Sequence, residues 1–457
     1  IAITRVLHYI ASLILLFLLT PQDFGIMAIV MSVMAIMNSL SSFGIDASLI
    51  SYRGDETKLS NEAWTLELIK GFALASLIIF LAPFISVWLS EPRLEPLLIF
   101  MSIGFILQSS KNIGLVSMRK NIDFSVIFKC EIGMALANFF TTIIFVSFYK
   151  SPWAIASGYI CGWAFYFFLS YFLCSYRPKL SFGKKNILNL LGYSKWILIS
   201  GQINSILDNG INLLIGNQFG ISLLGQFERA NMFTRQTALQ VGEVIWKVGL
   251  PSLSARSAST EELKNQYLLM LSYVCILIFP LLILVNIYIP FFLELNDSRD
   301  WSQFSVLLIL LGFIAALSML MTPGSILFQA IRMPNIGFKV AFLRFSITLI
   351  LIIPLIKFFG ILGVIFSLLF GVCIALPYTL YNVKKLIGIS LLEHLIICLK
   401  HLAPCFIFII LSPGEVLVLW DIIIFLITLT GYFLILYMSS VYFRKAIKYF
   451  LVSFLKK

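Results

Sequence analysis

The residues best suited to chemistry are polar side chains inside an apolar stretch, Gly192–Leu250. Asn204, Asp208 and Asn212 recur at every fourth position, so a helix places them on one stripe. A second run, after a turn near Phe219, carries polar residues that fall in one half of a helical wheel: Glu228, Asn231, Arg235, Gln236, Gln240, Glu243 and Lys247. A charge at mid-bilayer costs at least ~3 kcal/mol, so such side chains face a protein interior or a water-filled cavity. We expect this hairpin to form one wall of a central polar cavity.

Pairing within the hairpin follows from the same spacing. If the two helices run antiparallel, Arg235 lies level with Asn204 and about one turn from Asp208. An ion pair between Arg235 and Asp208 is then within reach and reduces the cost of burying either charge. The alternative is that this ion pair has only a structural role and joins the two helices. Glu243 and Lys247 are four residues apart, which favours a local ion pair.

The elements that position these residues are membrane-spanning helices. Of the 457 residues, 60% are hydrophobic and only 12% are charged, with a mean hydropathy of +0.99, whereas a soluble domain carries about 25% charge. At ~20 apolar residues per span, we expect an all-α polytopic membrane protein. The predicted spans, about fourteen in number, are 1–19, 24–50, 63–89, 94–116, 126–149, 152–174, 192–216, 222–250, 266–290, 302–327, 335–356, 360–383, 397–412 and 416–438.

Charge is unevenly divided between the connections. The net charge of +12 gathers in alternate connections and at the C-terminus, which indicates topology and excludes a nucleic-acid partner. The positive-inside rule places both termini in the cytoplasm. We expect the extreme N-terminus to be missing, since the chain opens on Ile1 inside a helix. The connections are too short for a folded soluble domain.

A weak internal repeat organises the spans. Phe24-Gly25, after the first outer turn, resembles Leu224-Gly225, at an offset of 200 residues. An even number of helices per repeat predicts two six-helix bundles, 1–175 and 192–385, related by an axis along the membrane normal. A further helix pair, 396–438, and a basic cytoplasmic tail, 439–457, lie outside the repeat.

Other polar residues within or near the spans are fewer. Arg5 lies near the start of the first helix, Lys129 opens the fifth, and Arg344 lies within the eleventh. His394 and His401 have no third ligand beside them, so we expect no metal site. The seven cysteines lack paired spacing, and no motif for catalysis, ATP or a cofactor is present, which favours a transporter over an enzyme.

Four motifs resemble polysaccharide-exporting flippases of the multidrug/oligosaccharidyl-lipid/polysaccharide superfamily. They are Leu19-Thr20-Pro21-Gln22-Asp23-Phe24-Gly25, then Phe43-Gly44-Ile45-Asp46-Ala47-Ser48-Leu49-Ile50, Met118-Arg119-Lys120-Asn121-Ile122-Asp123-Phe124, and Leu224-Gly225-Gln226-Phe227-Glu228-Arg229-Ala230-Asn231. The match extends over most of residues 1–385. At Gln226-Phe227-Glu228 the chain departs from the family, in which an aromatic pair and a small residue are commoner.

The resemblance implies a monomeric transporter of the bacterial cytoplasmic membrane. It would move undecaprenyl-pyrophosphate-linked oligosaccharide outward by alternating access, without a cofactor, for O-antigen, capsule or exopolysaccharide synthesis. The cavity would be lined mainly by the first, second, seventh and eighth spans, and the resemblance assigns its positive charge to Arg5 and Arg235, with Lys129 and Arg344 as further candidates. The polar residues of the hairpin complete the candidate substrate-binding set: Asn204, Asp208, Asn212, Asn231 and Gln240. Arginine suits the pyrophosphate, and amides suit sugar hydroxyls. Asp208 is also the candidate site for a coupling proton or Na⁺, since burial raises a carboxyl pKa.

Several alternatives stay open. A cation-coupled multidrug exporter or a lipid-linked peptidoglycan-precursor flippase belongs to the same superfamily. An integral-membrane polysaccharide polymerase or ligase would carry a large outer loop, whereas the longest one here is 291–301. A structural scaffold would not need polar residues inside its spans. Expected partners are membrane lipids, a polysaccharide polymerase and chain-length proteins.

Overall fold

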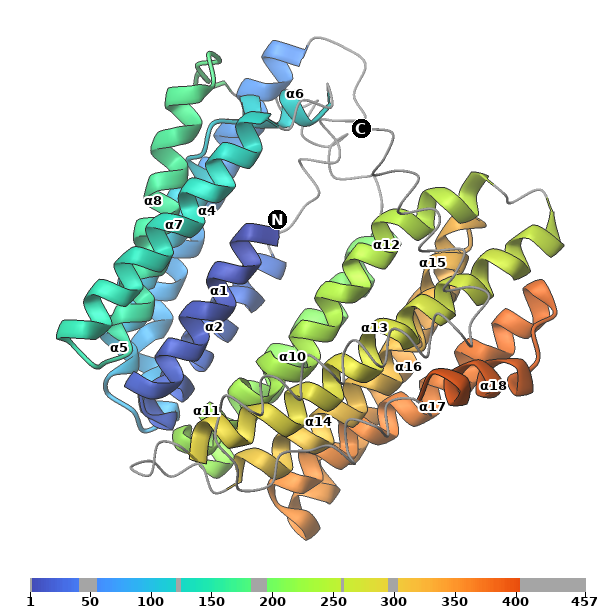
Figure 1. Ribbon diagram of the computed structural model, residues 1–457. Helices are drawn as coiled ribbons and strands as arrows, with labels where there is room; N and C mark the ends of the chain where they lie inside the picture. The colour runs from blue at the N-terminus through green and yellow to red at the C-terminus, as the bar shows by residue number, and fades with distance from the viewer. Residues whose placement is uncertain are drawn as a thin grey trace, which may run out of the picture. The chain divides into compact units, whose positions relative to one another are not determined.

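The protein is helical throughout its described part. The computed structural model describes residues 2–40, 56–120, 125–181, 195–255, 259–294 and 303–402, and no strand occurs within these ranges. The helices (Figure 1) are α1 (Ala2–Leu18), α2 (Pro21–Leu40), α4 (Glu56–Trp88), α5 (Leu94–Ser109), α6 (Gly114–Lys120), α7 (Ser125–Phe148), α8 (Trp153–Leu173), α10 (Lys195–Phe219), α11 (Ile221–Asn231), the π-helical turn η1 (Met232–Gln236), α12 (Thr237–Ala255), α13 (Thr260–Glu294), α14 (Phe304–Met319), α15 (Thr322–Ala330), α16 (Pro334–Phe359), α17 (Ile361–Ile387) and α18 (Leu391–Leu402). The all-α prediction is confirmed.

Eight stretches of helix in these ranges are long and apolar enough to cross a membrane. The longest of them, Leu59–Trp88, has 30 residues, more than the ~20 that a bilayer core requires. Each of the first twelve predicted spans overlaps one or more of the helices above. The fourteenth, 416–438, and the tail, 439–457, lie outside the described residues. The chain is therefore a multi-pass membrane protein.

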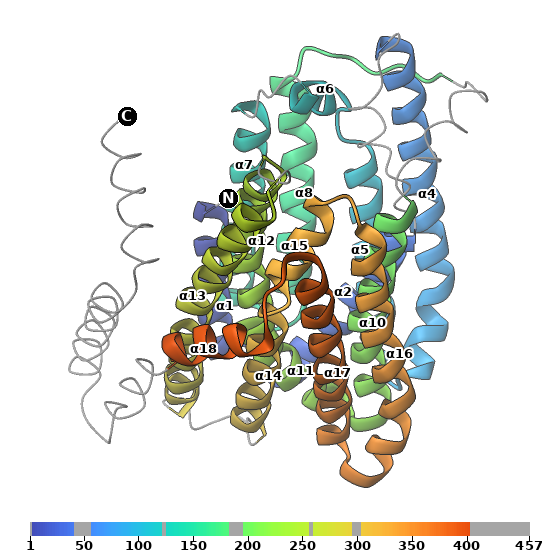
Figure 2. The same ribbon diagram turned by 90° about the vertical axis from the view of Figure 1, so that its right-hand side faces the viewer.

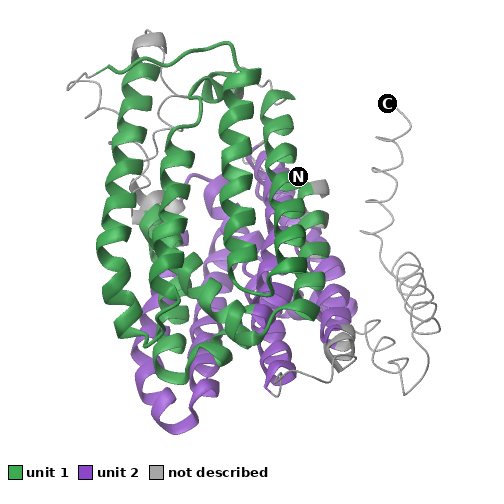
Figure 3. Ribbon diagram, turned by 90° about the vertical axis from the view of Figure 1, so that its left-hand side faces the viewer, with its two compact units in different colours: residues 1–228, 298–300 green, residues 229–297, 301–457 purple. Residues whose placement is uncertain are grey.

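Two compact units make up the structure (Figure 3). The first runs from Ile1 to Glu228, with Ser298–Asp300 counted in it, and the second takes in the rest of the chain. The boundary lies within α11 and not in the connection 176–191, because α10 packs along α2. The first helix of the predicted second bundle, 192–216, and the first residues of the second helix, up to Glu228, thus belong to the first compact unit. The two six-helix bundles stay a prediction.

The predicted spans 94–116 and 302–327 are each interrupted, and a single residue explains each interruption. The predicted span 94–116 ends at Ser109 and resumes at Gly114 as α6. Between them the Oδ1 of Asn112 accepts the Gly114 N–H at 2.9 Å, which offers the backbone an alternative to the helical bond. The predicted span 302–327 breaks before α15, where Pro323 occupies the first turn and has no N–H to donate.

The eighth predicted span, 222–250, is three consecutive pieces. It is helical as α11, widens to a π-helical turn at Met232–Gln236, and continues as α12. The Thr237 hydroxyl donates to the carbonyl of Met232, five residues back, at 3.1 Å. The extra residue in the turn changes the phase of the helix, so our single helical wheel does not describe this span. Ala238, Gly242, Ile245 and Gly249 form the buried face of α12, whereas Val244 and Val248 are exposed.

The repeat has a direct structural counterpart in the first unit. A Cβ added to Gly225 of α11 would overlap the carbonyl oxygen of Pro21 on α2, and a Cβ added to Gly25 would overlap the carbonyl oxygen of Ile221. Pro21 and Ile221 are 200 residues apart, as are Gly25 and Gly225, so the two contacts are reciprocal. Equivalent helices of the two repeats thus cross at backbone distance, which only glycine permits. We call this contact the glycine crossing.

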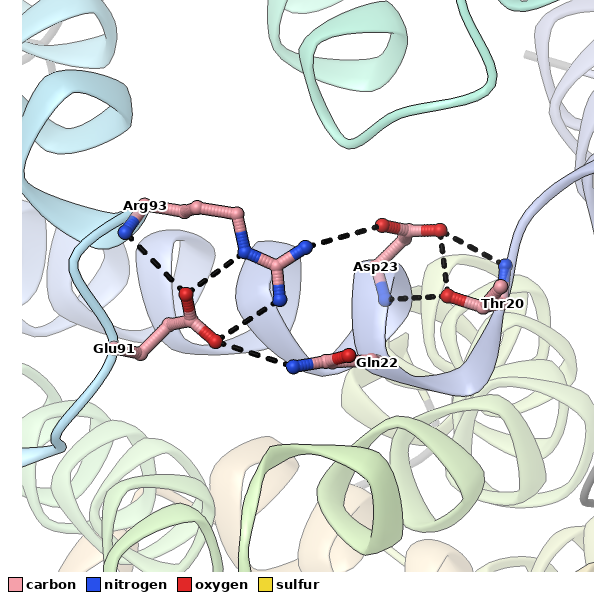
Figure 4. Close-up of polar contacts among 5 residues, drawn as sticks. All are labelled: Thr20, Gln22, Asp23, Glu91 and Arg93. Atoms are coloured by element: carbon pink, nitrogen blue, oxygen red, sulfur yellow. Dashed lines mark hydrogen bonds and ion pairs between the residues drawn. The ribbon is translucent and has the colours of Figure 1, made fainter.

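Polar side chains fix the helix ends close to the glycine crossing (Figure 4). Thr20 and Asp23 form a capping box: the Asp23 carboxylate accepts the Thr20 N–H at 3.0 Å and the Thr20 hydroxyl at 2.6 Å. In the turn between α4 and α5, the Arg93 guanidinium donates two hydrogen bonds, of 2.8 and 3.0 Å, to the Glu91 carboxylate. Gln22 donates to the same carboxylate at 3.2 Å. The bonds from Arg93 lower the pKa of Glu91, which favours the ionised form of this carboxylate.

Candidate functional site

The polar stripe on α10 ends in a buried hydrogen-bond cluster. Asn212 is only 6% exposed, and its Nδ2 donates to Ser32 Oγ on α2 at 2.8 Å and to Glu228 Oε1 on α11 at 2.6 Å. Ser32 and Glu228 are buried as well. One amide thus joins three helices, and a bond to a carboxylate is stronger than one between neutral groups.

The rest of the α10 stripe is less deeply placed. Asp208 is half-buried, while Asn209 donates to the carbonyl of Ser205 at 2.8 Å and so satisfies its own helix. Asn204 lies on α10 and Arg5 on α1, but their side chains lie outside the described part. Sequence reasoning found Asn212 and named Glu228 among the polar residues of the hairpin, but it missed Ser32 and both hydrogen bonds, because these contacts depend on how α2 and α11 pack.

Removing the Asn212 amide should destabilise the first unit. The Asn212→Leu variant leaves the Glu228 carboxylate without this donor in a buried place, and such a loss costs about 1–3 kcal/mol. Thermal unfolding of the purified protein measures it. Asn209→Leu is the matched control, because that amide bonds only within its own helix turn among the contacts described. Equal melting temperatures for the two variants would contradict this reading of the cluster.

The polar residues of the eighth span flank or occupy the π-helical turn. Asn231, which precedes it, is buried. Arg235, in the turn itself, and Gln240, one turn beyond it, are half-buried. The turn packs against α13 and α14. π-Helical turns recur at functional sites because the extra residue redirects a side chain, and Arg235 is the charged residue so placed here.

The remaining predicted site residues, Lys129 and Arg344, lie on α7 and α16. Lys129 of α7 is exposed. Arg344 of α16 is half-buried, and its Cγ lies near Gly371 of α17, between two packed helices. Glu243 and Lys247 form the predicted local ion pair at 2.8 Å.

The candidate residues are divided between the two units. Arg5, Lys129, Asn204, Asp208 and Asn212 belong to the first, whereas Asn231, Arg235, Gln240 and Arg344 belong to the second. A common cavity and the Arg235–Asp208 pair therefore stay predictions. What the structure does bring together is Asn212, Ser32 and Glu228.

Solved structures share this fold. A lipid II flippase, MurJ, in an inward closed conformation has a TM-score of 0.76 and 17% identity, covering 98% of this chain and all of that one. A multidrug resistance transporter of the MATE family, in an inward-facing conformation, has a TM-score of 0.68 and 15% identity, covering 84% of this chain and 96% of that one. At such identities the likeness shows the fold alone.

Curated relatives are similar over part of their length. The lipopolysaccharide biosynthesis protein WzxC of Escherichia coli K12 is 25% identical over 322 residues, 70% of this chain and 65% of WzxC. The teichuronic acid biosynthesis protein TuaB of Bacillus subtilis 168 is 23% identical over 295 residues, 62% of this chain and 59% of TuaB. The matched part is thus less than two thirds of either relative. A family model described as polysaccharide biosynthesis protein matches residues 14–306, well over half of the chain, and the chain therefore belongs to that family.

Proposed function

We propose that the chain is a flippase that carries an undecaprenyl-pyrophosphate-linked oligosaccharide across the bacterial cytoplasmic membrane. The observation that carries the proposal is the row of ionisable and amide side chains on α10, α11 and the π-helical turn, in a chain of this family. Such groups are costly inside a membrane and mark substrate pathways. Both termini lie in the cytoplasm in this proposal, and a polymerase and chain-length proteins act on the product.

The substrate explains why these residue types occur. The pyrophosphate is anionic, and the forked guanidinium of Arg235 suits its oxygens. Sugar hydroxyls both donate and accept, as do the amides of Asn204, Asn231 and Gln240. The lipid tail stays in the bilayer while the head group crosses through a hydrated cavity by alternating access. A coupling proton or Na⁺ is assigned to Asp208.

The test is flipping of a lipid-linked oligosaccharide in proteoliposomes, together with surface polysaccharide in cells. Arg235→Ala and Asp208→Ala, made separately, should each abolish both signals, because one removes the phosphate ligand and the other the coupling site. Membrane insertion should be unchanged. Lys247→Ala is the control, since Lys247 is exposed and pairs with Glu243. Normal polysaccharide from both variants would leave the hairpin a structural role only, and drug efflux in place of flipping would favour the multidrug exporter.

A further inference from the structure

The helix α18 runs in a different direction from the helix that precedes it. Its described part, Leu391–Leu402, has 12 residues. It packs on α13 and runs across the direction of α17 (Figure 2). The sequence predicts the thirteenth span at 397–412, whereas α18 begins six residues before that, at Leu391. Residues beyond Leu402 lie outside the described part.

One face of α18 is docked through polar contacts. The His394 ring nitrogen Nε2 lies 2.9 Å from the Tyr267 hydroxyl of α13, and both side chains are buried. Lys264 pairs with Glu393 at 2.8 Å, and Glu393 also accepts the Ser390 N–H at 2.7 Å as part of a capping box. Burial lowers the pKa of His394 and lowers that of His401 to about 4. The docked face is therefore neutral at physiological pH, apart from a matched ion pair.

The opposite face of α18 is apolar and exposed. Its members, each between 49% and 66% exposed, are Leu391, Leu392, Leu395, Ile396 and Leu399. Exposed cations accompany this face: Lys400 on α18 itself, and Lys384 and Lys385 in the last turn of α17, just before it. An apolar face beside lysines is typical of a helix that lies in a membrane interface and attracts anionic lipids.

We propose that α18 lies in the interface of the cytoplasmic leaflet and that Lys384, Lys385 and Lys400 bind the phosphate groups of anionic phospholipids there. The apolar face enters the acyl-chain boundary, and the three lysines meet the head groups. The protein thereby gains a lipid-specific site next to the second unit's α13 and α17. This site is separate from the proposed transport pathway and does not depend on which substrate is carried.

The experiment places a fluorescent label at Leu395→Cys of the full chain, with the native cysteines replaced, in proteoliposomes. Quenching by brominated phosphatidylglycerol is compared with quenching by brominated phosphatidylcholine. One lysine near a membrane strengthens anionic-lipid binding by about fivefold, so we expect a preference for phosphatidylglycerol of about that size or more. A label at Ile350→Cys is the control, because Ile350 is exposed on α16 and lies within an apolar run. It should show no preference.

Changing Lys384, Lys385 and Lys400 together to glutamine should bring the Leu395 label to the behaviour of the Ile350 label. Lys400→Gln alone should give a partial loss, which provides a milder variant should the triple one fold poorly. Equal quenching by both lipids with the lysines intact would overturn the proposal. So would an absence of quenching by either lipid, because the face would then be covered by protein, such as residues 403–457 of the chain.

Discussion

Gly225→Ala is expected to lower the melting temperature of the purified protein and to reduce flipping strongly, although it adds one methyl group. The added Cβ would overlap the carbonyl oxygen of Pro21, and a backbone atom cannot rotate aside as a side chain does. Overpacking costs about 1–3 kcal/mol where side chains can adjust, and the cost here should lie at or above the upper end. Gly25→Ala meets the carbonyl of Ile221 in the same way and should behave alike.

Gly210→Ala is the matched control for the glycine crossing. Gly210 lies on α10, and no described atom is within 4 Å of the place where its Cβ would be. Alanine in an unobstructed helix is favoured over glycine by up to about 1 kcal/mol, so this variant should be as stable as the parent or more so. Thermal unfolding and flipping, measured side by side, separate the two effects.

The double variant sharpens the test. Either substitution must push α2 and α11 apart at the same point, so the second methyl meets a gap that the first has already opened. The double variant, Gly25→Ala with Gly225→Ala, should therefore lose less stability than the sum of the losses of the two single variants, as for residues that share a contact. Additive effects, or stability equal to that of Gly210→Ala, would contradict the reciprocal contact.

The sequence predicts spans better than it predicts their interruptions. Hydropathy places most helices correctly because each must bury its backbone in a membrane. Hydropathy does not predict the helix break at Asn112, because that break depends on one side-chain hydrogen bond. Hydropathy also misses the π-helical turn at Met232–Gln236, because one extra residue in a helical turn does not alter the hydropathy of the span. The predicted thirteenth span starts too late, at residue 397, because the prediction follows the length of the apolar run, whereas the amphipathic α18 begins at Leu391.

The candidate site shows the same limit. Residue type and spacing identify Asn212 as a buried polar residue, but Ser32 is 180 residues away from it and has no signal of its own. The repeat likewise pairs Gly25 with Gly225 by position, whereas their mutual contact depends on how two helices pack. Local pattern therefore selects the residues, and tertiary packing decides what each one touches.

A cross-link between α4 and α10 is expected to stop transport reversibly. Asn217 of α10 donates to the carbonyl of Trp88 at the end of α4 at 3.0 Å, so cysteines at these two positions are within reach of a short bis-methanethiosulfonate reagent. α10 belongs to the second sequence repeat and α4 to the first. If alternating access moves the repeats relative to each other, this contact must separate in every cycle. In a background without native cysteines, Trp88→Cys with Asn217→Cys should flip normally until cross-linked and recover after reduction.

The matched control is a cross-link inside the first repeat. Gln108 of α5 donates to the Tyr159 hydroxyl of α8 at 2.6 Å, and Gln108→Cys with Tyr159→Cys should retain flipping when cross-linked. The comparison separates a moving contact from a general effect of the reagent, because both pairs join helices of the first compact unit. Flipping by the cross-linked Trp88–Asn217 pair at the rate of the control would show that α10 and α4 move together. The change of access would then have to occur beyond Glu228, where the first unit ends and the π-helical turn begins four residues later.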